Sequence, residues 1–552
     1  MDPRMAAEAS RILGETTYRL WGPGPGGFIY TRIGVTTGSL HLYKVGRGED
    51  IRLSEGPIEA AAGSSEWVIY SIYRPGGSIL EVHDGSEAQP VMGFKPGGRV
   101  IGLAVDQGMA AASVSLAQGV EVRIINPREA VVTSSISLEE AFRVETIHKG
   151  LIIGVDEASG HLGILDPVDG RLHLAKPPGG GRVKQVRSRD DDVSVLISNI
   201  VDEVYLYNIE IGFREKIAPG KEASRTSEVL DHGWLGRSLW TIARGNDTGL
   251  YLGGRRVNVK LRGNPRRAAP IPGGLAVEYS SITTPSRIAI IESPGGKARV
   301  RTPRGMEKAR PVVEASIRET RIEARNQVRV PLLVAEPRGA SRPGGVVIYI
   351  HEGPWGRVRD EWDPVIATLL LLGYSVVAPN YRGSSGEGRH YADMVLGDPG
   401  GGDLEDVVEA AQWARSQGLG EAIHLVGRGY GGYLAILASM EAPGIIRSVA
   451  VENPIVNWVD EVSSGDVGDR CRADTLFQGD TELMAKRSLT EMGLPKSRIL
   501  IVSSPPRARS VLDYAATLID SGIDVSLHVD RESERRFILE LALFLARPRR
   551  RG

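Results

Sequence analysis

The stretch Gly427-Arg428-Gly429-Tyr430-Gly431-Gly432-Tyr433 is the strongest indication of fold in the second part of this 552-residue sequence. An apolar run, Ile423–Val426, precedes it, and a helical pattern, Leu434–Met440, follows it. Short apolar runs before a glycine cluster are typical of buried strands, and the apolar residues after it continue at helical spacing. We therefore predict a strand, a sharp glycine turn and a helix, in that order.

The spacing of these glycines matches the pattern Gly-x-Ser-x-Gly, which holds a nucleophilic serine on a strained turn above the sheet of an α/β-hydrolase. Gly429 stands at the serine position, and glycine has no side chain with which to attack a substrate. Glycine also tolerates the strained backbone of such a turn, because it has no Cβ to clash. The sequence therefore predicts the scaffold of a hydrolase without its reactive atom.

Strands alternate with helices from about residue 310 onward. The apolar runs Val346–Ile350 and Tyr374–Pro379 are typical of buried strands, whereas Pro364–Leu372 and Leu404–Arg415 are typical of helices. Such alternation predicts a mostly parallel, doubly wound sheet that is covered by helices on both faces. We expect residues 306–552 to form this α/β-hydrolase domain.

Short strands separated by glycine turns fill residues 15–305, where long amphipathic helices are absent. Leu162–Leu165 and Arg171–Leu174, for example, flank an Asp-Gly dipeptide and predict a β-hairpin. At about 40 residues per blade, this length would fill a seven-bladed β-propeller. WD and kelch signatures are missing, so the number of blades rests on length, and two stacked β-sandwiches are the alternative.

Two shorter segments border the predicted propeller. Residues 1–14 are expected to form an N-terminal helical extension, because Met5–Leu13 shows a helical pattern that could pack onto the second domain. The arginine-rich segment Ala298–Ala309 contains a proline and a glycine and is expected to be the linker between the domains.

Composition narrows the class of protein. The 67 basic and 68 acidic residues nearly cancel, which gives no indication of a nucleic-acid partner or an anionic membrane surface. The single cysteine, Cys471, excludes an internal disulfide and suits a reducing compartment. The N-terminus opens no apolar signal segment, and no apolar stretch is long enough to span a bilayer. We expect a cytoplasmic protein without cofactors, whose excess of arginine over lysine is thermophile-like.

Four ordered motifs of the second region resemble the prolyl oligopeptidase family, and most closely its acylaminoacyl-peptidase branch. Tyr349–Pro354 looks like the family's His-Gly-Gly-Pro loop, and Asn380–Gly386 is similar to its Asn-Tyr-Arg-Gly-Ser-x-Gly segment. Gly397–Asp406 matches the family's next block, and Gly427–Tyr433 matches Gly-x-Ser-Tyr-Gly-Gly-Tyr except at the serine. The resemblance implies a propeller that filters access to a peptidase acting on short or N-blocked peptides.

The resemblance also implies a Ser, Asp and His triad in that chain order. Gly429 occupies the serine position. The aspartate should follow the strand Arg498–Val502, where Pro506 stands at its place with no aspartate nearby. Ser533 occupies the approximate place of the histidine, and no histidine follows it. We therefore predict that all three triad members are lost.

Backbone donors do not depend on a nucleophile, so the oxyanion hole that the resemblance implies is expected to survive. Its donors here would be the N–H groups of Gly353 and Tyr430. A triad works as a unit, and loss of its members removes most of the rate. The sequence predicts a non-catalytic pseudoenzyme that binds short or N-acylated peptides or has a regulatory role.

Two alternatives stay open. The first is an active serine peptidase or esterase that uses displaced residues, for example His528 with a nearby serine. The second is a scaffold role, as a homo-oligomer or as the partner of an active relative.

His351 is interpreted as a structural histidine. No metal site is expected, because the spacing of the acidic cluster matches no EF-hand, and we interpret it as a solvated loop; the cluster comprises Asp460, Glu461, Asp466 and Asp469.

Overall fold

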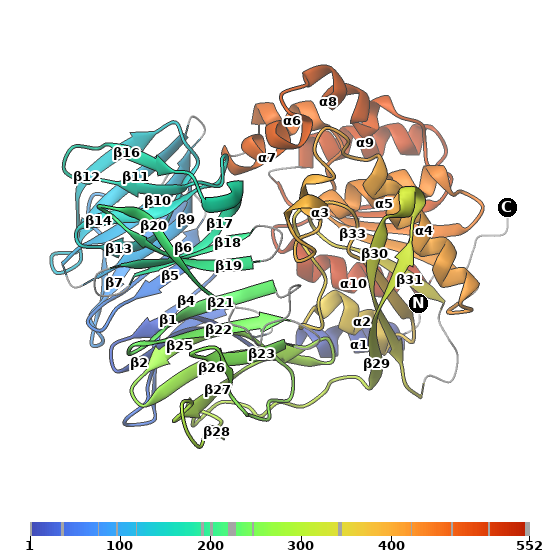
Figure 1. The fold of residues 1–552 in the computed structure, drawn as a ribbon. Coiled ribbons are helices and arrows are strands. Elements are labelled where there is room, and N and C mark those ends of the chain that lie inside the picture. Colours follow the sequence, from blue (N-terminus) through green and yellow to red (C-terminus); the bar gives the residue numbers. More distant parts are fainter. Residues whose placement is uncertain are drawn as a thin grey trace.

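The computed structural model of the chain shows two domains side by side, a β-propeller and an α/β domain (Figure 1). It describes residues 3–34, 38–74, 77–94, 98–106, 108–116, 119–188, 192–198, 202–218, 228–244, 248–339, 345–420, 422–464, 467–505 and 508–546. No helix within these residues is both long enough and apolar enough to cross a membrane.

The propeller has seven blades, each a four-stranded antiparallel sheet built from consecutive strands. The first two blades are formed by β1 (Thr17–Gly24), β2 (Gly27–Ile33), β3 (Gly38–Lys44), β4 (Glu49–Glu55), and by β5 (Ile58–Gly63), β6 (Val68–Arg74), β7 (Gly77–His83), β8 (Ala88–Pro90). The next two comprise β9 (Arg99–Val105), β10 (Ala110–Leu116), β11 (Gly119–Asn126), β12 (Val131–Leu138), and β13 (Phe142–His148), β14 (Leu151–Asp156), β15 (Leu162–Leu165), β16 (Leu172–Ala175). The last three comprise β17 (Arg182–Ser188), β18 (Val193–Ser198), β19 (Asp202–Asn208), β20 (Gly212–Ala218); β21 (Glu228–Leu235), β22 (Ser238–Arg244), β23 (Thr248–Leu252), β24 (Arg255–Arg256); and β25 (Asn264–Ile271), β26 (Gly274–Ser281), β27 (Thr284–Glu292), β28 (Arg299–Arg301).

This architecture confirms the predicted seven-bladed propeller, and the alternative of two stacked sandwiches is wrong. The predicted hairpin is also present, because β15 pairs with β16 and places Leu165 opposite Leu172. Neighbouring blades bury apolar side chains against each other, and the ring closes between the first and last blades. There Tyr18 and Phe28 share a core with Ile288, and the backbone N–H of Leu20 donates to the Glu278 carboxylate at 2.8 Å.

One expectation for the linker needs correction. The segment Ala298–Ala309 was expected to connect the domains, but Arg299–Arg301 forms β28, the outer strand of the last blade. Its backbone pairs with Ile290–Glu292 of β27, and the Arg301 guanidinium lies 2.7 Å from the Glu292 carboxylate. Arginine side chains on an edge strand face water, so an arginine-rich sequence is compatible with a strand at this position.

The α/β domain contains an eight-stranded sheet in the order β29-β30-β32-β31-β33-β34-β35-β36. The strands β29 and β30 pair antiparallel, β30 pairs antiparallel with β32, and the remaining pairs are parallel, as the sequence predicts. The strands are β29 (Ala315–Glu323), β30 (Arg329–Pro337), β31 (Val346–Ile350), β32 (Ser375–Pro379), β33 (Ile423–Arg428), β34 (Ile446–Glu452), β35 (Arg498–Ser503) and β36 (Val525–Val529).

Helices cover both faces of this sheet, which confirms the predicted α/β-hydrolase architecture. On one face α4, α5 and α9 bury Val407, Leu434 and Tyr514 in a common core, and on the other face α2 and α10 bury Val365 and Phe537. The helices are α1 (Pro3–Leu13), α2 (Pro364–Leu371), α3 (Arg389–Asp393), α4 (Gly402–Ser416), α5 (Tyr430–Glu441), α6 (Trp458–Ser464), α7 (Val467–Phe477), α8 (Thr481–Arg487), α9 (Ala508–Asp520) and α10 (Ser533–Ala546).

The N-terminal helix α1 packs on the α/β domain although the propeller follows it in the sequence (Figure 1). Ala9 is fully buried in the core that α2 and α10 share, and Ile12 packs against Ala367 of α2. The Arg11 guanidinium also donates to the carbonyl of Val312 at 2.8 Å. The chain therefore starts on the α/β domain, crosses to the propeller and returns.

Candidate functional site

Gly429 lies on the turn between β33 and α5, as the sequence predicts. Its φ of 53° and ψ of −119° are values that residues with a Cβ rarely adopt. Its N–H donates to the carbonyl of Glu452 at 2.9 Å, which fixes the turn against the end of β34. Helix and sheet also approach closely here, because a Cβ on Gly431 would lie 2.2 Å from the carbonyl oxygen of Ile350. The turn thus has the strained geometry that presents a residue above the sheet.

The loop that follows β31 lies beside this turn. A Cβ on Gly431 would lie 2.3 Å from the carbonyl oxygen of His351, and a Cβ on Gly353 would lie 2.3 Å from the Tyr381 hydroxyl. That hydroxyl donates to the His351 carbonyl at 3.1 Å and fixes the loop. The structure therefore brings together the segments that carry the predicted oxyanion donors, the N–H groups of Gly353 and Tyr430.

Glu352 is the residue at this site that sequence reasoning missed. A Cβ built on Gly429 would lie 3.0 Å from Cγ and 3.2 Å from Oε1 of Glu352. The glutamate side chain is exposed and covers the place toward which a side chain at position 429 would project. The signal was present in the sequence, because Glu352 stands where the His-Gly-Gly-Pro loop has its first glycine.

Tyr430 anchors the start of α5 below the turn. Its side chain is buried, and its hydroxyl donates to the carboxyl group of Asp403 at the start of α4. Burial raises the pKa of Asp403 to about 7, although the Tyr430 hydroxyl counteracts this rise. The Tyr430 ring also packs against Tyr381, Tyr433 and Trp458. This aromatic cluster holds the helix N-terminus rigidly against the sheet.

Ser533, at the predicted histidine position, is the first residue of α10 and is almost completely buried. Its hydroxyl donates to the Glu452 carboxylate at 2.8 Å and accepts from the Asn453 side-chain amide at 3.1 Å. The Arg428 guanidinium lies 2.7 Å from the same carboxylate and 3.1 Å from that of Glu534. These side chains therefore form a polar network next to Gly429.

The pKa values of this network follow from burial and pairing. Burial raises the pKa of the Glu452 carboxyl, and the neighbouring Arg428 counteracts the rise. For Arg428, burial acts to lower the pKa, but the acidic groups around it, Glu452 and Glu534 among them, produce a net rise. The charges satisfy one another, so the network positions the elements β33, β34 and α10 and has no free base.

Pro506, at the predicted aspartate position, lies outside the described residues. The strand before it, β35, ends at Ser503, whose side chain is fully buried. The next residue, Ser504, donates its backbone N–H to the Asn453 side-chain oxygen at 2.6 Å. The chain after β35 is therefore fastened to the end of β34, beside the Glu452 network.

Two histidines that could act as bases are engaged elsewhere. The buried His351 ring contacts the Ser384 hydroxyl at 2.9 Å and stacks on Tyr381, and burial lowers its pKa to about 4. Ser384 is itself fully buried, so this pair does not reach a substrate. His528 contacts the Glu540 carboxylate at 3.3 Å and the Arg536 guanidinium at 3.2 Å on α10. Among the described residues, neither histidine forms a dyad with an accessible serine.

Within the described part of the chain, no three histidine, cysteine, aspartate or glutamate side chains are grouped so that they could hold a metal ion. The acidic stretch around α6 includes Asp466, which lies outside the described residues.

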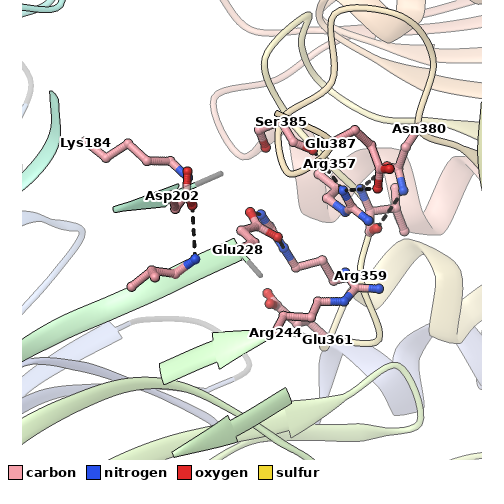
Figure 2. Close-up of polar contacts among 12 residues, drawn as sticks. Lys184, Asp202, Glu228, Arg244, Arg357, Arg359, Glu361, Asn380, Ser385 and Glu387 are labelled. Atoms are coloured by element: carbon pink, nitrogen blue, oxygen red, sulfur yellow. Dashed lines mark hydrogen bonds and ion pairs between the residues drawn. The ribbon is translucent and has the colours of Figure 1, made fainter. Parts of the chain in front are cut away.

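An ionic interface between the domains adjoins the loop of Glu352. The buried Glu228 of β21 accepts hydrogen bonds from the Arg359 guanidinium, and Lys184 lies 2.7 Å from Asp202 nearby (Figure 2). Arg357 binds Glu387 at 3.0 Å within the α/β domain. The loop that follows Gly353 therefore fastens the propeller to the α/β domain.

Comparison with known sequences matches the middle of the second domain. Residues 362–482 match the prolyl oligopeptidase family. Acylamino-acid-releasing enzyme 1 of Oryza sativa subsp. japonica is 30% identical over 142 residues, 25% of this chain and 18% of that protein. The acylamino-acid-releasing enzyme of Mus musculus is 28% identical over 156 residues, 28% of this chain and 21% of that protein. The chain thus spans about a fifth of the length of these curated relatives.

Solved structures resemble the fold along almost the whole chain. The Pyrococcus horikoshii acylaminoacyl peptidase superposes with a TM-score of 0.71 at 14% identity and covers 97% of this chain and 96% of its own. A puromycin-hydrolyzing peptidase of Mycobacterium tuberculosis gives 0.77 at 15% identity, over 97% and 94%. Residues 362–482 thus match the prolyl oligopeptidase family, and the two-domain fold of the whole chain resembles these solved structures.

Proposed function

We propose that this chain is a pseudoenzyme that binds short peptides without cleaving them. The observation that carries the proposal is Gly429, which occupies the strained turn between β33 and α5 and has no side chain. The turn, the adjoining loop and the start of α5 remain in the arrangement that would orient an acyl group, so binding does not require the missing hydroxyl.

The surroundings of the turn support the same proposal. Ser533 binds the Glu452 carboxylate and has no group that could take up a proton from a nucleophile at neutral pH. Because triad members act as a unit, a site without the nucleophile, the orienting acid and the base retains only binding and the oxyanion donors. We include Pro506 among the lost positions on the strength of the sequence.

Hydrolysis assays with the purified protein test this proposal. Acyl-amino-acid and p-nitrophenyl ester substrates would be incubated at moderate and high temperature, with an active family member as the positive control. We expect no turnover and no adduct with a serine-directed fluorophosphonate by mass spectrometry. Turnover that a bulky residue at Gly429 abolishes would overturn the proposal and would favour an active hydrolase with displaced residues.

The cellular setting and the assembly are further parts of the proposal. We infer a cytoplasmic protein, since the one cysteine suits a reducing compartment. We also infer self-association or association with an active relative, as the family resemblance implies. Light scattering of the pure protein, alone and mixed with an active relative, would test this; a mass of one chain in both samples would contradict it.

The domain limits follow from where secondary structure stops. We propose an extension at residues 1–14, a propeller at 15–305 and a hydrolase domain at 306–552, because β28 ends at Arg301 and β29 begins at Ala315. Limited proteolysis should cut between these strands first. Early cleavage within a blade instead would contradict these limits.

A further inference from the structure

The carboxylate of Glu352 stands where the side chain of a nucleophile would project. The Cβ of any residue at position 429 would meet Cγ of Glu352 at 3.0 Å and Oε1 at 3.2 Å. Gly429 leaves this space to the glutamate. The place of a hydroxyl group that would attack a carbonyl carbon is thereby taken by a negative charge.

This charge has no partner among the residues that the structure describes. No described residue forms an ion pair or hydrogen bond with the Glu352 carboxylate, whereas the cations of neighbouring segments have acidic partners of their own. Arg357 binds Glu387 and Arg359 binds Glu228. Arg428 binds Glu452 and Glu534 behind the turn. The negative charge of Glu352 is therefore exposed and available to a ligand.

We propose that Glu352 binds the protonated α-amino group of a short peptide at the place of the missing nucleophile. The inference rests on the proposed function, since it assumes that the site binds peptides, and it deepens that function by naming the ligand class. A carboxylate is an acceptor-only group, and an ammonium group is a donor-only group, so the two are complementary in charge and in hydrogen bonding.

The same charge discriminates against the ligands of an acyl-transfer site. An N-acylated peptide has no ammonium group and leaves the Glu352 carboxylate without a partner, which is unfavourable once the ligand excludes water. An oxyanion formed at Gly353 and Tyr430 would also lie near a second negative charge. The site therefore selects free peptides over N-acylated ones and opposes the charge that hydrolysis develops.

Fluorescence anisotropy with a matched pair of peptides tests this proposal. Both are Ala-Ala-Ala-Phe with a neutral dye at the C-terminal end, and one of them is N-acetylated. At a pH of about 6.5 the free α-amino group, whose ordinary pKa is about 7.7–8.0, is largely protonated. For the wild type we expect the free peptide to bind about tenfold more tightly than the acetylated one, since a hydrogen bond between charged groups is worth that much.

Three variants of the full chain complete the experiment. Glu352→Gln keeps the size of the side chain and removes its charge, and we expect the preference for the free peptide to fall below about twofold, the range of a weak exposed contact. Glu352→Asp keeps the charge and should retain part of the preference. Glu66→Gln removes an exposed carboxylate on the propeller and should retain all of it. Thermal unfolding of each variant checks that it is folded.

The outcomes separate the inference from the proposed function. If both peptides bind the wild type equally, or if the preference survives in Glu352→Gln, the role of Glu352 is wrong while peptide binding stands. If neither peptide binds at millimolar concentration, both proposals are wrong. Cleavage of either peptide, read from the same samples by mass spectrometry, would overturn the proposed function alone when the preference still depends on Glu352.

Discussion

The backbone conformation of Gly429 connects the stability of the turn to the position of Glu352. The φ of 53° suits glycine, whereas a serine held there by an active enzyme stores strain of about 1–3 kcal/mol. Under the proposed function no catalysis is required, and glycine then avoids the strain and leaves Glu352 room to cover the turn. Stability and charge at the site therefore change together through one residue.

The first prediction concerns Gly429→Ser. We expect no hydrolysis of p-nitrophenyl esters, because no base or orienting acid accompanies the hydroxyl, and a loss of about 1–3 kcal/mol in the free energy of unfolding from backbone strain. Urea denaturation and the ester assay measure both. Gly429→Ala is the matched control, with the same strain and no hydroxyl. Ester hydrolysis by the serine variant but not by the alanine variant would contradict the prediction.

The second prediction concerns pH and Asp403. Burial raises the folded-state pKa of this carboxyl to about 7, so the folded protein holds a proton that the unfolded chain releases near pH 4. The contribution of Asp403 to stability is therefore fully present below about pH 4 and is lost as pH rises toward 7, by up to about 1.4 kcal/mol per pH unit.

Asp403→Asn removes this titration while its side-chain oxygen can still accept from Tyr430. Urea denaturation from pH 4 to pH 8 measures the unfolding free energy of both proteins. As the pH rises to about 7, the variant should become more stable relative to the wild type, and above pH 7 the difference should stay constant. Parallel stability profiles would show that Asp403 titrates normally in the folded protein.

Among the elements, α1 packs against both α2 and α10 of the α/β domain. Ile12 is 2% exposed and packs against Ala367 and Val312. Ile12→Ala should lower the free energy of unfolding by about 2–5 kcal/mol, because it leaves a cavity in the packing of α1 on α2. The exposed Ser10→Ala on the same helix is the control and should change stability by less than about 0.5 kcal/mol. Equal effects of the two substitutions in urea denaturation would contradict this packing role.

The elements that the sequence predicted are those with a local signal. The turn at Gly429 and the hairpin of β15 and β16 follow from spacing and turn residues within a few positions. The strand β28 was missed because its pairing with β27 uses backbone groups, which arginine side chains do not reveal. Glu352 could have been recognised as an anomaly in its loop, but not its position over Gly429.

The network at Ser533 shows the limit of sequence reasoning at the site. Its hydroxyl binds Glu452, which is 81 positions away in the chain, and neither residue lies in a motif that indicates the contact. The sequence predicted that Ser533 stands where a histidine is expected. It could not predict that Glu452 and Arg428 would form an ion pair beside Ser533. Contacts of this kind depend on the order of strands in the finished sheet.

At the scale of the whole molecule, Glu228 holds the propeller on the α/β domain (Figure 2). It is 4% exposed and accepts hydrogen bonds from Arg359, which follows the loop of Glu352. Burial acts to raise the pKa of Glu228, but the cations Arg359, Lys184 and Arg357 more than offset this and lower it to about 2. The loop that forms the candidate site is therefore positioned by the domain interface as well as by its own sheet.

The last prediction is that Glu228→Gln loosens this interface. The variant leaves the Arg359 guanidinium without its carboxylate, which should cost about 3 kcal/mol at pH 7. The pKa of Glu228 is lowered on folding, so its contribution is present above about pH 4.3, the ordinary value for glutamate, and is lost as pH falls toward 2. The difference between wild type and variant in urea denaturation should therefore shrink at pH 3.

Glu482→Gln, at an exposed pair with Lys486, is the control and should have almost no effect at either pH. A Glu228→Gln protein as stable as the wild type at pH 7 would contradict a role of this ion pair in holding the domains together.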